Sequence, residues 1–221
     1  SNANLITIKP DDKAAAKVLD FTAETVPAGT TRTGKLALCK ITQANVFTQE
    51  LVAVVAAKRV SVEGKKTYLD KNTIVVLTGQ VEGSGHERSF TWTAPADGDY
   101  ELLTFWLHGT GQTASPSVSV SYTVNYIDKY GVEALINYWA KEVVTPDLAK
   151  MIRENGRVQM YMDSLELSTY GKGGQFWGYH LILDCKACDK TKITDGEHIR
   201  RFSKTLVEAI DMKAYGEPLL Q

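Results

Sequence analysis

The sequence is poor in three features that would place it quickly in a functional class: cysteine, net charge and long apolar runs. Its 3 cysteines in 221 residues exclude a scaffold built on disulfides. The 25 Lys and Arg residues balance 26 Asp and Glu residues, and a net charge of −1 argues against a nucleic-acid binder. No run approaches the roughly 18 apolar residues that a membrane span needs. A hydrophobic content of 43% can still build a substantial core, so we expect a folded chain of one or two domains.

The start of the sequence leaves localisation open. Ser1-Asn2-Ala3 is typical of the remnant of a cleaved expression tag, so the native start is hidden. We expect a periplasmic or extracellular protein if a signal peptide once preceded this point. Length adds a constraint, because a complete (β/α)8 barrel takes about 250 residues. A chain of 221 residues is therefore not expected to hold such a barrel together with a separate β-domain.

The chain up to Asp128 has the pattern of a β-domain. The clearest predicted strand is Ser117–Tyr126, in which apolar and polar residues alternate so that one face is buried and the other is wet. Asp97-Gly98-Asp99 separates two further strand-like runs and predicts a hairpin. Roughly six short strands in about 95 residues indicate an antiparallel β-sandwich of the jelly-roll kind. The predicted strands are 36–45, 51–62, 73–81, 87–93, 100–108 and 117–126.

After Asp128 the apolar residues follow the period of a helix. A continuous apolar stripe runs from Val132 to Val143. Thr145 is expected to cap a second helix, which starts with a proline and ends at Gly156. Two helices are therefore predicted in succession.

A short predicted strand, Val158–Asp163, follows these helices. The segment from about residue 124 to residue 163 thus resembles one βαβ step of a parallel sheet. We predict an α+β chain in two parts: a jelly-roll-like β-sandwich over residues 1–128, and a helical region over residues 129–221 with the βαβ remnant of a truncated (β/α)8 barrel. The uncovered edge of the strand would favour a homodimer.

Asp163 and Glu166 are the candidate catalytic residues. They lie just past the predicted strand, where side chains of a parallel α/β unit face the ligand crevice. Glycoside hydrolysis uses one carboxyl group as proton donor and another as base or nucleophile, and burial or like charge separates their pKa values. The alternative is that both carboxylates cap the next helix or lie in solvent.

Trp177 and Tyr179 follow a glycine-rich loop after these carboxylates and are the candidate substrate-binding residues. Their rings would line a sugar pocket or, alternatively, cover an exposed sheet edge. Other aromatic residues lie in predicted strands, where we expect core positions rather than a sugar platform. These are Trp92, Tyr100, Phe105 and Trp106.

The spacing of possible ligands predicts no metal site. Cys185-Lys186-Ala187-Cys188 is a lone C-x-x-C segment. With His180 and His198 nearby it would allow a zinc site, a redox pair or a disulfide, although two ordinary thiols are favoured. Asp97-Gly98-Asp99 lacks the spacing of a calcium loop and is expected to form a plain turn.

Several segments follow one another in the order and spacing of a known enzyme family. They are Glu50-Leu51-Val52-Ala53-Val54-Val55-Ala56-Ala57, Thr91-Trp92-Thr93-Ala94-Pro95, Gly98-Asp99-Tyr100, Val124-Asn125-Tyr126-Ile127-Asp128, the helix from Val132 to Trp139, Met162-Asp163-Ser164-Leu165-Glu166 and Phe176-Trp177. Together they resemble the bacterial α-L-rhamnosidases of glycoside hydrolase family one hundred and six. The resemblance spans residues 36–180, and after Tyr179 the sequence departs from the family pattern.

The resemblance implies a calcium-assisted, inverting hydrolase that removes terminal rhamnose from plant polysaccharides. Such an enzyme acts in a large (β/α)8 barrel with attached β-sandwiches. The resemblance also implies that Glu166 matches a catalytic carboxylate and that Asp163 is its structural neighbour. The second carboxylate and most barrel strands have no counterpart in this sequence.

One carboxylate alone runs neither the one-step nor the two-step mechanism of glycoside hydrolysis. We therefore expect a carbohydrate-related, rhamnosidase-like protein that is inactive alone. The alternatives are a non-catalytic carbohydrate-binding β-sandwich and a self-associating interaction protein. In each case we expect no nucleic-acid partner and no membrane span.

Overall fold

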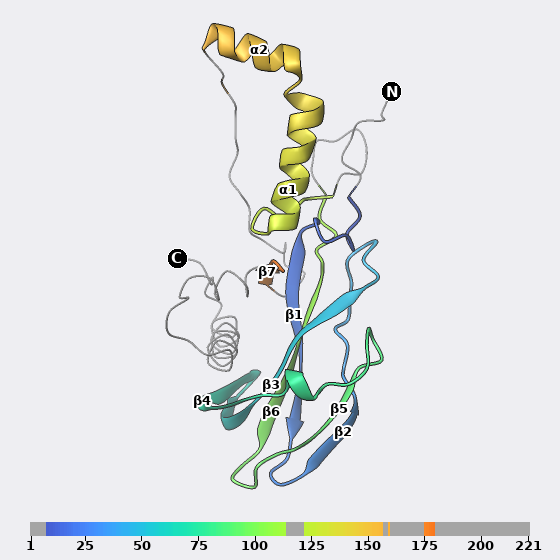
Figure 1. The fold of residues 1–221 in the computed structure, drawn as a ribbon. Coiled ribbons are helices and arrows are strands. Elements are labelled where there is room, and N and C mark those ends of the chain that lie inside the picture. The colour runs from blue at the N-terminus through green and yellow to red at the C-terminus, as the bar shows by residue number, and fades with distance from the viewer. Residues whose placement is uncertain (1–7, 114–121, 157–158, 160–174, 180–221) are drawn as a thin grey trace. The chain divides into compact units, whose positions relative to one another are not determined.

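The computed structural model describes residues 8–113, 122–156, 159 and 175–179. Its strands are β1 (Lys17–Val26), β2 (Thr31–Lys35), β3 (Gln49–Glu63), β4 (Lys66–Val76), β5 (Ser89–Thr93), β6 (Tyr100–Gly109) and β7 (Gln175–Trp177) (Figure 1). They form one sheet in the order β4-β3-β6-β1-β7 and a separate pair, β2-β5. The chain divides into two compact units. Unit 1 comprises Ser1–Leu19, Ile41–Thr48 and His108–Leu181, and unit 2 comprises Asp20–Lys40, Gln49–Leu107 and Ile182–Gln221.

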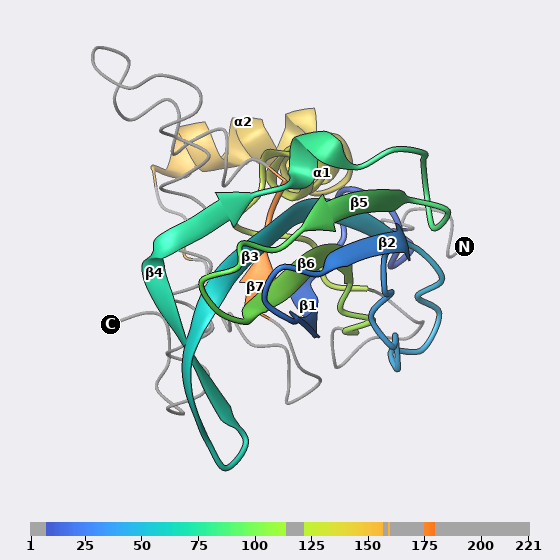
Figure 2. The same cartoon turned by 90° about the horizontal axis from the view of Figure 1, so that it is seen from below.

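Unit 2 contains a curled sheet made from β3, β4 and most of β6 and β1 (Figure 2). β3 and β4 form an antiparallel hairpin that closes with Glu63 opposite Lys66. Gly64 in the turn has a φ of 62°, a left-handed conformation that glycine adopts without strain. Residues 53–57 of β3 are all buried, so this part of the strand is covered on both faces.

β2 and β5 form a separate antiparallel ribbon in unit 2. On its exposed face the hydroxyls of Thr31 and Thr93 form a cross-strand hydrogen bond of 2.8 Å. The opposite face carries Phe90, which is buried in the hydrophobic core. The alternation of the strand thus separates a polar face from an apolar one.

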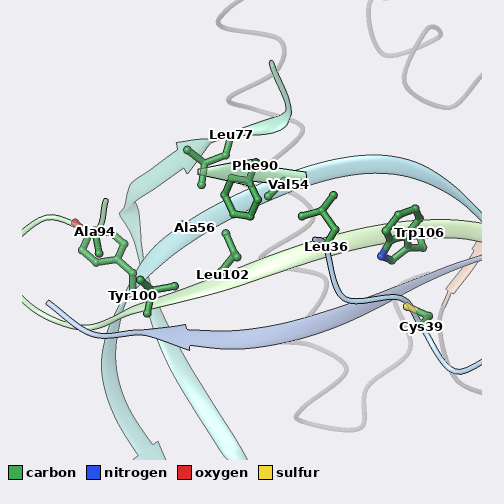
Figure 3. Packing of buried hydrophobic residues seen from close by; sticks show 11 residues of the cluster. Leu36, Cys39, Val54, Ala56, Leu77, Phe90, Ala94, Tyr100, Leu102 and Trp106 are labelled. Atoms are coloured by element: carbon green, nitrogen blue, oxygen red, sulfur yellow. The ribbon is translucent and has the colours of Figure 1, made fainter. Parts of the chain in front are cut away.

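The core of unit 2 is filled by side chains from both the ribbon and the curled sheet (Figure 3). Phe90 of β5 lies against Val54 of β3 and Leu102 of β6. Trp106 is fully buried, and its indole Nε1 donates a 2.9 Å hydrogen bond to the carbonyl of Ala37. The buried members are Val26, Leu36, Cys39, Val54, Ala56, Leu77, Phe90, Ala94, Tyr100, Leu102 and Trp106.

In the described part of unit 1, helices α1 (Lys129–Tyr138) and α2 (Pro146–Asn155) are separated by the π-helical turn η2 (Trp139–Val143). β7 pairs antiparallel with the start of β1, where Lys17 lies opposite Trp177. An isolated bridge also joins Ala15 to Val124. Backbone pairing thus connects segments of unit 1 that are far apart in sequence.

The mostly antiparallel β architecture with short helices confirms the coarse fold prediction. Predicted strands 51–62, 87–93 and 100–108 correspond to β3, β5 and β6. The second helix also begins and ends as predicted. The Thr145 hydroxyl accepts a 3.4 Å hydrogen bond from the Leu148 N–H, and Gly156 ends α2 with a φ of 64°.

The strand predicted over residues 36–45 is wrong, since these residues form an irregular segment. At Cys39 the side chain of Gln49, and not a neighbouring strand, forms the hydrogen bonds to the backbone. The Cys39 N–H donates to Gln49 Oε1 at 3.0 Å, and Gln49 Nε2 donates to the Cys39 carbonyl at 3.0 Å. The strands β1 and β2 form where the sequence pattern predicted none.

Two other predicted elements differ in extent. β4 ends at Val76, and a 3₁₀ turn, η1 (Thr78–Gln80), follows because the Thr78 hydroxyl accepts a 2.9 Å hydrogen bond from the Val54 N–H. The apolar stripe predicted as one α-helix becomes π-helical at Trp139. There the Val144 N–H donates to the Trp139 carbonyl at 2.7 Å, five residues back.

The described end of the predicted strand Ser117–Tyr126 forms only isolated bridges. Asn125, which the alternation assigns to the wet face, is fully buried. The predicted change of pattern at Asp128 coincides with the start of α1, because Asp128 caps that helix. The division into residues 1–128 and 129–221 stays a prediction, and most of the predicted strand Val158–Asp163 lies outside the described residues.

Candidate functional site

Trp177 and Tyr179 lie in a short segment that is held in unit 1 by a buried asparagine. Asn125 Nδ2 donates a 2.7 Å hydrogen bond to the Trp177 carbonyl, and Asn125 Oδ1 accepts one of 3.3 Å from the Ile127 N–H. The Asn125 backbone N–H also donates to the carbonyl of Ala14. A fully buried amide with several partners fixes the position of both chain segments.

Aromatic residues follow Asn125 in the chain and flank its hydrogen-bond partner Trp177, and four of them form two ring pairs. Tyr126 and Phe176 are stacked, with ring centroids 5.9 Å apart and an angle of 6° between their planes. Tyr130 and Tyr179 meet edge to face at 5.8 Å and 83°. Both arrangements are favourable, because aromatic rings are negative on their faces and positive at their edges. We call Tyr126, Tyr130, Phe176, Trp177 and Tyr179 the aromatic cluster.

Asp128 and two glycines determine how closely these segments approach. The carboxylate of Asp128 is buried and accepts a 3.0 Å hydrogen bond from the Tyr130 N–H, which caps α1. A Cβ atom at Gly178 would lie 2.8 Å from Asp128 Oδ2. A Cβ atom at Gly131 would lie only 2.2 Å from the carbonyl oxygen of Asn125. The cluster therefore requires glycine at both positions.

One lysine supplies positive charge beside the cluster. Lys13 Nζ lies 5.3 Å from the ring centroid of Tyr130 and 5.8 Å from that of Tyr179. These distances are within the range of a cation–π interaction. Lys13 is exposed, so its ammonium group can also donate hydrogen bonds to a bound molecule.

The half-buried rings and the nearby ammonium group define what this arrangement can do chemically. Trp177 and Tyr179 are neither fully buried nor fully exposed. Binding sites for small organic molecules combine aromatic surface with a few polar groups that fix orientation. The aromatic cluster and Lys13 provide both.

The predicted catalytic residues Asp163 and Glu166 lie outside the described residues, as do Cys185, Cys188, His180 and His198. Of the predicted site residues, the structure therefore positions Trp177 and Tyr179. Within the described ranges, no group of three or more His, Cys, Asp or Glu side chains could hold a metal ion.

The Asp97-Gly98-Asp99 segment forms a turn, as its spacing predicted. Lys58 Nζ donates to Asp97 Oδ2 at 3.0 Å, and the Tyr100 hydroxyl donates to Asp97 Oδ1 at 3.3 Å. Asp99 Oδ1 accepts a 3.0 Å hydrogen bond from the Ala28 N–H. The hydrogen bond from Lys58 lowers the pKa of Asp97, and burial raises the pKa of Tyr100. Both carboxylates thus stabilise the turn.

The aromatic residues of the predicted strands belong to the core, as expected. Tyr100, Phe105 and Trp106 are buried. Trp92 is partly buried and packs edge to face on Tyr100, with centroids 5.7 Å apart. A sugar platform on these four residues is therefore excluded.

Lys13 and Tyr130 are site residues that the sequence pattern did not identify. Lys13 precedes every recognised motif and carries no local signal. Tyr130 belongs to no segment that the sequence pattern singled out. Asp128 had a weak signal, because a polar residue directly before a helix commonly caps it, whereas Asn125 lies three residues further from the helix.

Comparison with protein-family models, curated proteins and solved structures gave no match to this chain. Within the described residues, no helix combines the length and the apolar character needed to span a membrane.

Proposed function

We propose that this protein binds carbohydrate at the aromatic cluster of unit 1 and is related to the α-L-rhamnosidases. The observation that carries the proposal is the contact between two segments of the rhamnosidase resemblance, Val124–Asp128 and Phe176-Trp177. They are 48 or more residues apart in sequence, yet Asn125 is hydrogen bonded to Trp177 and Tyr126 is stacked on Phe176. Segments that resemble one enzyme family in sequence thus meet in one small site.

The chemistry of the cluster supports a sugar as ligand. A sugar ring has an apolar face that packs on an aromatic ring, and hydroxyl groups that accept hydrogen bonds from an ammonium group. Tyr179 and Trp177 supply the rings and Lys13 supplies the donor. The proposed ligand is a plant oligosaccharide with a terminal rhamnose.

Catalysis concerns Asp163 and Glu166, which lie outside the described residues. We propose that Glu166 and Asp163 lie near the bound sugar, at the end of a βαβ step that follows a jelly-roll-like β-sandwich. Hydrolysis needs a second carboxylate in addition to Glu166. The proposed protein therefore binds rhamnose-containing glycans and does not cleave them on its own, with or without calcium.

Binding is tested by thermal shift and calorimetry with a panel of rhamnose-containing and rhamnose-free oligosaccharides. A ligand at one hundred times its Kd is expected to stabilise the protein by about 2.7 kcal/mol. Tyr179→Ala should weaken binding about two- to twelvefold, since an aromatic contact is worth about 0.5–1.5 kcal/mol. Phe47→Ala is the matched control, because Phe47 is 75% exposed and belongs to the same unit but not to the cluster.

The proposal is wrong if no oligosaccharide binds, or if Tyr179→Ala and Phe47→Ala have the same effect. Hydrolysis is measured separately with an aryl α-L-rhamnoside. Release of the aryl group that Glu166→Gln abolishes would show an active hydrolase and contradict the proposed lack of catalysis.

A further inference from the structure

The apolar stripe of α1 is exposed in the structure. Val132, Leu135 and Ile136 of α1 and Trp139, the first residue of η2, follow one another at helical spacing, and 37–58% of each residue is exposed. Gly131 is the only fully buried residue of α1. An apolar row of this kind normally faces a core or a partner. We call these four residues the α1 stripe.

We propose that the α1 stripe is a dimer interface at which a second copy of this chain packs its own α1 in antiparallel orientation. The proposal is independent of carbohydrate binding. It rests on the symmetry of the stripe, on its charges and on its area.

The stripe is self-complementary in an antiparallel arrangement. A two-fold axis between Leu135 and Ile136 brings Val132 of each copy opposite Trp139 of the other. A small side chain thus meets a large one, and Leu135 meets Ile136 at the centre. Such an interface uses the same surface of both copies and closes on itself.

The charges around the stripe are complementary in the same arrangement. Lys129 and Glu142 flank the stripe at its two ends, and within one chain they pair with Glu133 at 3.6 Å and with Lys141 at 3.1 Å. An antiparallel partner would bring the Lys129 end of each stripe near the Glu142 end of the other. The segment 129–156 carries four basic and four acidic residues, so it has no net charge to oppose association. These pairs would fix the antiparallel direction.

The area fits a weak dimer. With about 200 Å² for a fully exposed side chain of this size, the stripe offers on the order of 350 Å² of apolar surface per copy. Two copies would bury roughly 700 Å², which is the apolar share of an interface of roughly 1,200 Å². This is the lower limit for specific association, so we expect a concentration-dependent dimer with a micromolar Kd.

Sedimentation velocity of the full chain from about 1 to about 300 µM tests the proposal, because this range brackets a micromolar Kd. Ile136→Glu should raise the dimer Kd about tenfold or more. Asn137→Glu is the matched control, since it adds the same charge to the neighbouring exposed residue, away from the stripe, and should change the Kd less than about twofold. Far-ultraviolet circular dichroism should be the same for all variants.

The orientation has its own test. Lys129→Glu should weaken the dimer, and Lys129→Glu combined with Glu142→Lys should restore it. A wild-type chain that stays monomeric up to the highest concentration overturns the proposal. So does a dimer that Ile136→Glu leaves unchanged. A dimer weakened by Ile136→Glu but not rescued by the double exchange overturns the antiparallel arrangement.

Discussion

Gly131→Ala should destabilise the protein, although the same substitution stabilises most helices. In an ordinary helix interior, replacing glycine by alanine contributes about 1 kcal/mol of stability. Gly131 is buried in the first turn of α1, and a Cβ atom there would lie 2.2 Å from the Asn125 carbonyl oxygen and 2.7 Å from Asn125 N. The obstacle is backbone rather than a flexible side chain, so the helix start must move by about 1 Å to restore van der Waals contact.

The magnitude follows from the contacts that such a movement would break. Overpacking by one methyl group costs about 1–3 kcal/mol. The hydrogen bonds from the Tyr130 N–H to Asp128 and from Asn125 Nδ2 to the Trp177 carbonyl contribute about 1 kcal/mol each. After the gain in helix propensity is subtracted, we expect a loss of about 2–4 kcal/mol. For a chain of this size that lowers Tm by roughly 5–15 °C.

Thermal unfolding followed by circular dichroism measures this loss. Asn137→Ala is the control on the exposed side of the same helix, and it should raise stability by about half a kcal/mol. Gly131→Ala should also weaken glycan binding, because it displaces Asn125, whose side-chain amide holds Trp177. A Gly131→Ala variant as stable as the wild type, or more stable, would refute the steric argument.

Three further predictions concern other parts of the fold. The hydrogen bond from Lys58 lowers the pKa of Asp97, so the ion pair contributes stability above the usual carboxyl pKa and loses it as the pH falls through the lowered pKa. Lys58→Met should return the Asp97 pKa to its usual range in an NMR titration, and an unchanged pKa would contradict this cause. Gln49→Leu should cost about 2–4 kcal/mol in urea unfolding because it removes both buried hydrogen bonds between the Gln49 amide and the Cys39 backbone, and a loss below about 1 kcal/mol would disprove that role. Thr145→Ala should cost about 1 kcal/mol while Thr145→Ser costs less, and equal stability of all three proteins would show that the cap is not needed.

Local signals in the sequence predicted those elements whose determinants are close together in the chain. Thr145 and Gly156 define the ends of α2 through their own side-chain and backbone preferences, and both were identified correctly. The core role of Trp106 was likewise predictable, because aromatic residues in strands are usually buried. The coarse β-rich class follows from the same kind of signal.

Contacts between distant residues determined what the sequence did not reveal. The irregular segment at Cys39 depends on the amide of Gln49, ten residues away. The burial of Asn125 depends on a carbonyl 52 residues further along the chain, so the alternating pattern assigned it to the wrong face. Lys13 joins the site only because the fold brings it beside Tyr130. No local preference encodes such pairings.

The pairing of β1 with β7 has a consequence for the synthesis of the protein. Lys17 pairs with Trp177, and the later residue leaves the ribosome only after 160 more residues have been added (17 to 177). At about 5–20 residues per second, this interval lasts roughly 8–30 s. During that time Val18 and Leu19, which are buried in the final fold, lack one of the two strands that neighbour β1. One edge of the start of β1 therefore stays open for this interval, as a strand edge that a ribosome-associated chaperone could shield.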